Sequence, residues 1–306
     1  MPARKTKASA VAEPRRFTVP VDNRWGVGEM AVLDFGDPNR PVDMVFAHAT
    51  GFNAMTYRSL LSPLADQFRI WAPDLRGHGR STLPTPPGWK RSWHDHRDDL
   101  TALLDTLDGP PVVLAGHSMG ATSSLLAAAE RPDRVRALAL LDPVIWNRLA
   151  VLALNLPLLR RSARKIPLAR NAGKRRPRFD SAEAAFEAYR GRGAFKGWPD
   201  AMLHDYLTDG LAADGPDAKD GGVTLTCAPE WEAANYAAQA HNPWLALGRV
   251  RCPVRILKAE TNSTCFVPDH AFGLSRVEAR TLPGGNHFFP MLMQDAARRH
   301  LADSLA

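Results

Sequence analysis

The stretch VVLAGHSMGATSSLLAAA, residues 112–129, places one serine at an abrupt change of backbone pattern. An apolar run ends at Gly116, and a helix of small residues is expected to begin near Ala121. Ser118 lies between them, with Gly116 and Gly120 two residues away on either side. A strand that turns at once into a helix strains the corner residue, so its neighbours must be nearly free of side chains. We therefore expect the Ser118 hydroxyl to project from the edge of a sheet; a serine N-cap between two glycines is the alternative.

A serine hydroxyl is a poor nucleophile until a base removes its proton, so a reactive Ser118 requires a histidine. Of the ten histidines, His287 in the sequence LPGGNHFFP follows the last predicted strand and is expected at the same sheet edge. An acid must then orient the imidazole. Asp142, directly after the apolar run ALALL, is favoured over Glu260, with Asp269 third. Taken alone, His287 could be a loop histidine and Asp142 a turn cap.

Extended and helical segments alternate along the chain from residue 17 onward. Strands are expected at 16–21, 29–36, 42–48, 69–74, 111–116, 136–142, 252–260 and 276–282. Helices are expected around Leu60–Phe68 and at 94–108, 119–130 and 295–305. The first two strands form an antiparallel opening pair. Continuous apolar strands separated by helices are typical of an α/β fold with a mostly parallel sheet covered on both faces.

Region 143–250 interrupts this alternation and predicts a mainly helical cap between the core segments 17–142 and 251–306. Its aromatic residues could line a substrate pocket, although more than half are expected to form the core of the cap itself. They are Trp146, Phe186, Tyr189, Phe195, Trp198, Tyr206, Trp231 and Tyr236. The three chosen as substrate-binding candidates are Trp146, Trp198 and Trp231.

The net charge of +7 is concentrated in two segments. Residues 1–16 carry five Lys or Arg and one acid, and residues 143–179 carry ten and none, which leaves 24 basic and 31 acidic residues elsewhere. We expect 1–16 to be a disordered basic tail and 143–179 a solvated surface of the lid, with an anionic substrate or a membrane surface as alternatives. No recognised nucleic-acid reader motif accompanies the charge, so no nucleic-acid partner is expected.

Composition favours a globular protein, with 45% apolar and 23% charged residues. Residues 1–16 lack the apolar core of a signal peptide, and the apolar run 149–159 is too short for stable membrane insertion. The three cysteines show no C-x-x-C spacing, which predicts a cytoplasmic location. No cofactor and no metal are expected, because no phosphate-binding glycine loop or metal-ligand cluster accompanies the strands.

Together these motifs resemble the α/β-hydrolase superfamily, in particular its capped, esterase-like serine hydrolases. Besides GHSMG, the segment DLRGHGRS (74–81) is similar to the family's loop after its fourth strand. HATGF (48–52) is similar to its oxyanion loop with two extra residues, and GGNHFFP to its histidine loop. The resemblance covers nearly the whole chain from about residue 17. It implies an eight-stranded sheet, a helical cap inserted after the sixth strand, and an active site between cap and core.

The resemblance also implies a Ser-His-acid triad and an oxyanion hole formed by the N–H groups of Met119 and Phe52. The family's usual acid follows the strand that here ends in LKAE, where this chain has Asn262. Haloalkane dehalogenases and their relatives place the acid after the sixth strand instead, as Asp142 would be. Those enzymes use an Asp nucleophile, so Ser118 argues against dehalogenation and epoxide opening.

The expected function is hydrolysis of a carboxylic ester through an acyl-enzyme intermediate. The expected partner is a small-molecule ester, with an apolar acyl or aromatic part. The same residues are compatible with hydrolysis of a C–C bond, a lactone or an amide, and with a cofactor-free perhydrolase. A slow-turnover ligand receptor is the alternative outside ordinary enzymes.

Overall fold

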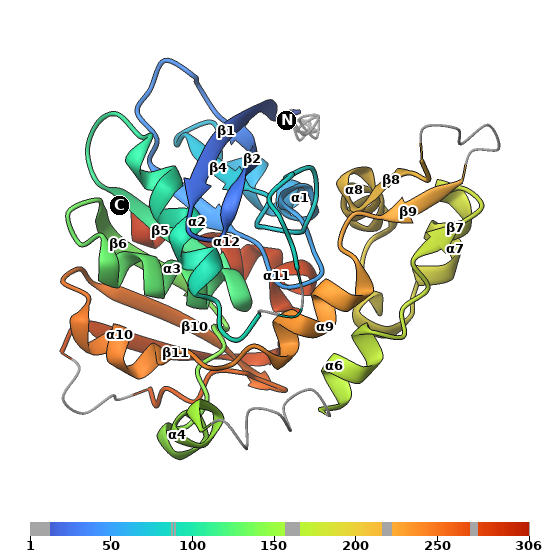
Figure 1. Cartoon of the computed structure of the whole chain (residues 1–306). Helices are drawn as coiled ribbons and strands as arrows, with labels where there is room; N and C mark the ends of the chain where they lie inside the picture. Colours follow the sequence, from blue (N-terminus) through green and yellow to red (C-terminus); the bar gives the residue numbers. More distant parts are fainter. Residues whose placement is uncertain are drawn as a thin grey trace, which may run out of the picture.

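An eight-stranded β-sheet forms the centre of the molecule (Figure 1). The computed structural model describes residues 13–86, 88, 90–156, 166–215, 222–269 and 275–305. The strands lie in the spatial order β1-β2-β4-β3-β5-β6-β10-β11. Their bounds are β1 (Arg15–Asn23), β2 (Gly26–Phe35), β3 (Met44–Ala47), β4 (Ile70–Pro73), β5 (Val112–His117), β6 (Val135–Leu141), β10 (Val254–Thr261) and β11 (Val277–Asn286).

Strand direction divides the sheet into an antiparallel start and a parallel remainder. β1 pairs antiparallel with β2, and β2 pairs antiparallel with β4. The other neighbouring strands pair in parallel. The predicted opening pair and the mostly parallel eight-stranded sheet are therefore confirmed. Because parallel strands end at the same edge, the residues that follow β5, β6, β10 and β11 meet there.

Helices cover both faces of the sheet. α2 (His94–Asp105), α3 (Met119–Glu130) and α10 (Pro243–Arg249) pack on one face, and α1 (Arg58–Leu61), α11 (Phe289–Leu292) and α12 (Gln294–Leu305) on the other. Alternate residues of β5 point to opposite faces: Val112 and Leu114 join the first core cluster, and Val113 and Ala115 the second. Burial on both faces explains why this strand is a continuous apolar run.

The helix expected around residues 60–68 is broken into short pieces. The 3₁₀ turns η1 (Ala54–Tyr57) and η2 (Ser62–Leu64) flank α1. Pro63 lies in the first turn of η2 and has no N–H to continue an α-helical pattern, which accounts for the break. Leu60, Leu61 and Leu64 are nevertheless buried, as their spacing predicts.

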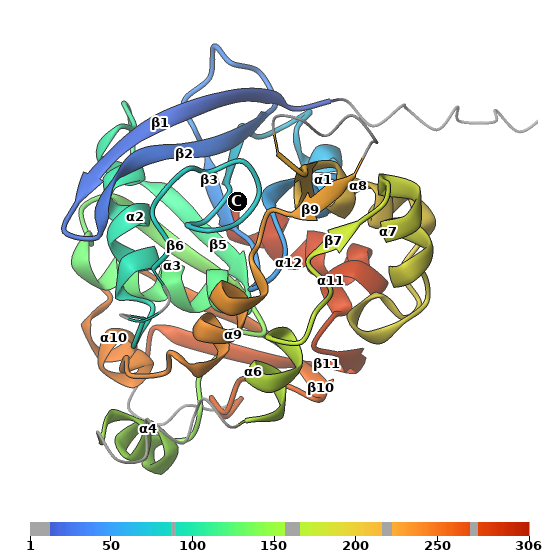
Figure 2. The same ribbon diagram turned by 45° about the vertical axis from the view of Figure 1, so that its right-hand side comes forward.

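The inserted region contains helices and a small second sheet (Figure 2). Its helices are α4 (Arg148–Asn155), α6 (Pro167–Ala172), α7 (Ala182–Tyr189), the 3₁₀ turn η4 (Gly193–Phe195), α8 (Asp200–Gly210) and α9 (Pro229–Ala237). The strands β7 (Arg178–Phe179), β8 (Leu211–Ala213) and β9 (Val223–Leu225) pair antiparallel in the order β7-β9-β8. These strands were not expected, because two or three residues are too short to show a period in the sequence.

The boundaries of the core differ slightly from those expected. β1 begins at Arg15, so part of the predicted 1–16 tail belongs to the sheet, and residues 1–12 lie outside the described residues. α10 lies within 143–250 but packs on α3, in the helical layer of the core. Among the described residues, no helix has the length and apolarity needed to cross a bilayer.

Candidate active site

Ser118 occupies a strained turn between β5 and α3. Its backbone has φ 54° and ψ −118°, which residues with a Cβ atom rarely adopt. A Cβ atom placed on Gly120 would lie 2.2 Å from the carbonyl oxygen of Ala47, and one on Gly116 would lie 2.7 Å from the same oxygen. The two flanking positions therefore admit no side chain. The strained turn at Ser118 that the glycine spacing predicts is therefore confirmed.

Two loops bring an imidazole and a carboxylate to Ser118. His287 directly follows β11, and Asp142 directly follows β6. His287 Nε2 lies 3.1 Å from Ser118 Oγ, and His287 Nδ1 lies 2.5 Å from Asp142 Oδ2. Since β5, β6, β10 and β11 are successive neighbours, their ends meet at one sheet edge. The structure thus brings together the predicted serine, the predicted histidine and the favoured acid.

Asp142 is fully buried, with 0% of its surface exposed, and it is held by several donors. Its Oδ1 accepts the N–H of Ala259 at 3.0 Å and the hydroxyl of Ser263 at 2.5 Å. Its Oδ2 accepts the N–H of Thr264 at 3.2 Å. Burial raises the pKa of Asp142, but the His287 imidazole and these donors outweigh burial and hold the pKa below its usual value. The carboxylate is therefore ionised at neutral pH and can orient the imidazole.

The alternative acids are engaged elsewhere. Glu260 Oε2 accepts the N–H of Gly284 at 2.9 Å, near the end of β11. Asp269 Oδ1 lies 2.9 Å from Nζ of Lys258. Asn262, at the position where the family's usual acid is expected, has a positive φ of 54°. This turn after β10 leads directly into the segment that donates to Asp142.

A buried hydrogen-bond chain connects the loops of the site, and sequence reasoning missed it. The N–H of Ala49 donates to Tyr57 Oη at 3.2 Å, and Tyr57 Oη lies 2.8 Å from His117 Nδ1. His117 Nε2 lies 2.8 Å from the carbonyl oxygen of His287. A carbonyl only accepts, so His117 Nε2 carries the proton and Nδ1 accepts from Tyr57. Burial and the neighbouring His287 lower the pKa of His117 to about 3, which keeps this ring neutral.

The loop 48–52 has three N–H groups that already have acceptors. The Ala49 N–H donates to Tyr57, the Gly51 N–H donates to His78 Nε2 at 3.1 Å, and the Phe52 N–H donates to the Ala49 carbonyl at 3.2 Å. Phe52, predicted as an oxyanion donor, is thus turned toward its own loop. Thr50 donates its hydroxyl to Met119 Sδ at 3.0 Å, which places Thr50 beside the start of α3.

A buried polar cluster of the inserted region contacts the same loop. A Cβ atom on Gly51, where φ is 77°, would lie 2.7 Å from Glu232 Oε1 of α9. Glu232 pairs with Arg175, and Arg175 Nη2 donates to the hydroxyls of Tyr189 and Tyr206 at 2.9 Å each. Glycine at position 51 therefore lets the carboxylate approach the loop closely, and the cluster packs the inserted region against it.

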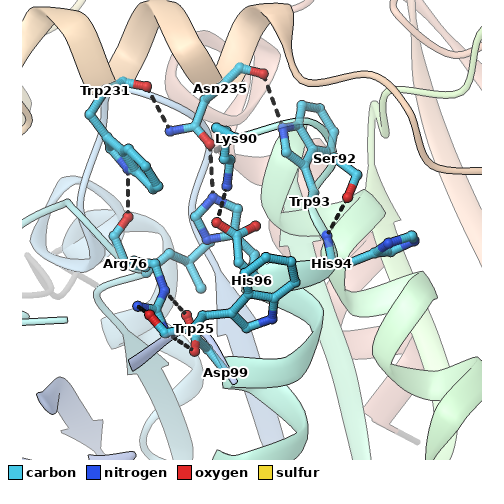
Figure 3. Close-up of polar contacts among 12 residues, drawn as sticks. Trp25, Arg76, Lys90, Ser92, Trp93, His94, His96, Asp99, Trp231 and Asn235 are labelled. Carbon is cyan, nitrogen blue, oxygen red and sulfur yellow. Dashed lines mark hydrogen bonds and ion pairs between the residues drawn. The ribbon is translucent and has the colours of Figure 1, made fainter. Parts of the chain in front are cut away.

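A second polar network joins α9 to the segment after β4 (Figure 3). Trp231 Nε1 donates to the Arg76 carbonyl at 2.9 Å, and Asn235 Oδ1 lies 2.9 Å from His96 Nε2. Lys90 pairs with Asp95, and its Nζ lies 4.7 Å from the centre of the Trp231 ring. These contacts anchor α9 to the core.

The three tryptophans predicted to bind substrate lie in different places. Trp231 is 1% exposed and belongs to the network just described. Trp146 donates to Gln239 Oε1 at 3.2 Å, beside α10. Trp198 has its ring 5.3 Å from that of Phe52 and is the one in contact with the loop 48–52. The structure therefore does not gather the three around Ser118.

Neither a metal-binding cluster nor a disulfide is present among the described residues. No group of three His, Cys, Asp or Glu side chains there is placed to hold a metal ion. Cys227, Cys252 and Cys265 are free and buried. The cytoplasmic location expected from the cysteine spacing stays a prediction.

Comparison with known proteins identifies the family. A family model described as the alpha/beta hydrolase family matches residues 44–299. The chain belongs to the alpha/beta hydrolase family. Among solved structures, E-2-(acetamidomethylene)succinate hydrolase has a TM-score of 0.71 at 23% identity, covering 95% of this chain and 99% of that one. A hypothetical protein from Pseudomonas aeruginosa PAO1 has a TM-score of 0.67 at 27% identity, covering 94% and 98%.

Curated relatives of this hydrolase match over shorter stretches. A 2-(acetamidomethylene)succinate hydrolase from Mesorhizobium japonicum is 38% identical over 99 residues, 32% of this chain and 34% of that protein. A lipase from Mycobacterium tuberculosis is 37% identical over 110 residues, 35% of this chain and 40% of that protein. The chain thus spans 34–40% of the length of these two relatives.

Proposed function

We propose that this alpha/beta hydrolase cleaves a carboxylic ester through an acyl-enzyme intermediate. The observation that carries the proposal is the series Ser118 Oγ, His287 and Asp142, with separations of 3.1 and 2.5 Å. A nucleophile, a base and an acid that orients the base form the arrangement on which serine hydrolases rely, whatever the order in the chain.

The proposed reaction has two steps. Ser118 Oγ attacks the ester carbonyl while His287 Nε2 takes the hydroxyl proton, and the imidazolium then gives that proton to the departing alcohol. In the second step His287 removes a proton from water, the hydroxide attacks the acyl-Ser118 carbonyl, and the imidazolium returns the proton to Ser118 as the acid leaves. Asp142 stays ionised throughout and stabilises the imidazolium.

Two backbone N–H groups are proposed to bind the oxyanion. Met119 is the first residue of α3, where an N–H group has no acceptor within the helix. We propose Thr50 as the second donor instead of Phe52, because the other N–H groups of the loop at 49, 51 and 52 have acceptors. One such donor contributes about 3 kcal/mol to transition-state stabilisation.

The proposed substrate is a small-molecule ester with an apolar acyl or aromatic part. Phe288 follows His287, and its ring lies 6.3 Å from the ring of Phe52. Phe52 also contacts Phe195 and Trp198, at 6.2 and 5.3 Å between ring centres. A cluster of aromatic rings beside the histidine favours an apolar group on the substrate.

Hydrolysis of a C–C bond, a lactone or an amide, and perhydrolysis, would use the same nucleophile and base. A slow receptor would keep the serine but turn over little. Dehalogenation and epoxide opening are disfavoured, because a serine stands where those reactions need a carboxylate nucleophile.

Steady-state kinetics on panels of p-nitrophenyl esters, lactones and ring-fission ketones tests the proposal. We expect p-nitrophenyl esters to be hydrolysed faster than lactones and ring-fission ketones. Replacing Ser118 by Ala removes the nucleophile and should lower kcat/KM for the best ester by roughly 10⁴-fold or more. The thermal unfolding temperature should change little, because the substitution removes one oxygen atom. Ester hydrolysis that survives in Ser118→Ala would show that this serine is not the nucleophile. If the wild type cleaves ketones or lactones faster than esters, that reaction replaces ester cleavage as the proposed function.

A further inference from the structure

Large apolar side chains are exposed mainly on one side of the molecule. Five of them form what we call the apolar face: Leu149, Leu152, Leu156, Leu245 and Phe266. The other three exposed residues are Val27, Leu168 and Leu292, which belong to other elements. Leu149 is 78% exposed and Leu152 62% exposed. They stand three residues apart on α4 and share one side of the helix, and Leu156 is the C-cap residue that follows. Val151 is buried on the opposite side.

Contacts between α4, α10 and the segment after β10 join these side chains into one surface. The Arg148 guanidinium lies 4.6 Å from the centre of the Trp244 ring, and Trp244 Nε1 donates to the Trp146 carbonyl at 2.8 Å. The Trp146 ring lies 5.7 Å from that of Phe266. Leu245 lines one hollow with the end of α4. Figures 1 and 2 both show α4 projecting from the molecule near α10.

Two of the helices that build the apolar face, α4 and α10, carry an arginine each and no acid, whereas Glu260 and Asp269 flank Phe266. Residues 143–179 contain ten Lys or Arg, residues 233–259 contain four, and neither range contains Asp or Glu. Arg148 and Arg249 are exposed and form no ion pair within the described part of the chain. Glu130 lines the hollow beside Arg249, but it is paired with Arg97 at 3.2 Å. The arginines of α4 and α10 are thus not neutralised within the described residues. Elsewhere in 143–179, Arg175, Arg176 and Arg178 are paired with acids.

We propose that the apolar face docks on the surface of an anionic lipid bilayer. Exposed leucines on a short amphipathic helix can enter the boundary between headgroups and acyl chains, and flanking arginines then meet lipid phosphates. A second copy of this chain would bring two positive faces together, and a nucleic acid would offer the leucines no apolar medium. The proposal concerns a surface separate from Ser118 and does not depend on the ester chemistry.

Vesicle co-sedimentation of the full chain tests the docking. Wild-type protein should sediment with vesicles that contain phosphatidylglycerol, and much less with vesicles of phosphatidylcholine alone or at raised salt. Leu149→Glu/Leu152→Glu should lower the partition coefficient by roughly tenfold or more, because each leucine loses its burial in the bilayer. Arg148→Gln/Arg249→Gln should lower it about fivefold per arginine. Val27→Glu, a matched change at an exposed apolar residue elsewhere, should have no effect.

Three outcomes would overturn the docking. The first is unchanged vesicle binding by Leu149→Glu/Leu152→Glu with native circular dichroism. The second is no binding to anionic vesicles while the protein binds duplex DNA. The third is a wild-type dimer in sedimentation velocity that the double leucine variant dissociates, without vesicle binding by the wild type. Ser118→Ala should bind vesicles as the wild type does, which separates this test from that of the proposed function.

Discussion

At the scale of single residues, the site depends on side chains that hold loops as well as on those that would react. Tyr57 and His117 link the Ala49 N–H to the His287 carbonyl through buried hydrogen bonds. Neither residue would touch a substrate carbonyl bound at Ser118. Their effect is positional, because they fix the loop 48–52 and the backbone of the histidine loop relative to β5.

Replacing Tyr57 by Phe tests this positional role. The change keeps the ring but leaves the Ala49 N–H and His117 Nδ1 without their partner, so the free energy of unfolding should fall by about 1–3 kcal/mol. We expect kcat for an ester to fall more than KM rises, because the loop carries the proposed oxyanion donor. Urea unfolding and steady-state kinetics measure the two effects. Tyr236→Phe removes a tyrosine hydroxyl that is not part of this hydrogen-bond chain and is the control. Equal losses of stability and of kcat in both variants would argue against a special role for Tyr57.

At the scale of elements, the first turn of α3 packs directly on the end of β3. The Gly120 Cα approaches the Ala47 carbonyl so closely that no Cβ atom fits between them. The contact fixes where α3 begins, and with it the direction of the Met119 N–H. Packing of one helix start on one strand end thus positions both Ser118, the proposed nucleophile, and the Met119 N–H, a proposed oxyanion donor.

A pair of glycine-to-alanine variants tests that contact. Gly120→Ala should push α3 away from β3, lower the free energy of unfolding by about 1–3 kcal/mol or more, and abolish ester turnover. Gly248→Ala lies in α10, where nothing stands within 4 Å of the added methyl group. That variant should keep full activity and gain up to about 1 kcal/mol of stability, because alanine favours a helix. Thermal denaturation and ester kinetics compare the two variants. A Gly120→Ala variant that is as active and as stable as the wild type would contradict the close packing of α3 on β3.

At the scale of the whole molecule, the core encloses neutral histidines that acid would charge. Burial lowers the pKa of His48 and His300 to about 4, and of His96, His117 and His241 to about 3. The unfolded chain titrates near 6.5, so between about pH 6.5 and 4 the unfolded state binds more protons than the folded state. Stability contributed by these groups is therefore present above pH 6.5 and lost as the pH falls.

We expect the free energy of unfolding to fall from pH 7 to pH 4, on the order of 1–3 kcal/mol for each buried histidine. Asp74 has the opposite effect on the free energy of unfolding, because burial raises its pKa to about 7 and the folded state then holds a proton that the unfolded state releases. The histidines are more numerous, so their effect sets the sign. Urea denaturation at a series of pH values, read by circular dichroism, measures the slope. A free energy of unfolding that is constant or rises toward pH 4 would contradict the buried, neutral state of these rings.

The sequence predicts the sheet and the proposed catalytic side chains for a physical reason. Ser118 and Asp142 follow apolar strands, His287 follows the last strand of the sheet, and ends of neighbouring parallel strands meet in space. Tyr57 and Phe52 lie in a loop with short 3₁₀ turns, where no period marks which group is buried or bonded. Trp231 is one of many cap aromatics, and composition does not distinguish a buried anchor from a pocket wall. Contacts between the inserted region and the core depend on tertiary packing.

The central claim is that His287, oriented by Asp142, activates Ser118. Labelling with a fluorophosphonate probe, followed by peptide mass spectrometry, measures this directly in the wild type and in two matched variants. We expect the label on Ser118, a rate of labelling at least about 100-fold lower in Asp142→Asn, and a near wild-type rate in Glu260→Gln. A wild-type protein that takes up no label on Ser118, or a loss of labelling in Glu260→Gln but not in Asp142→Asn, would contradict the claim.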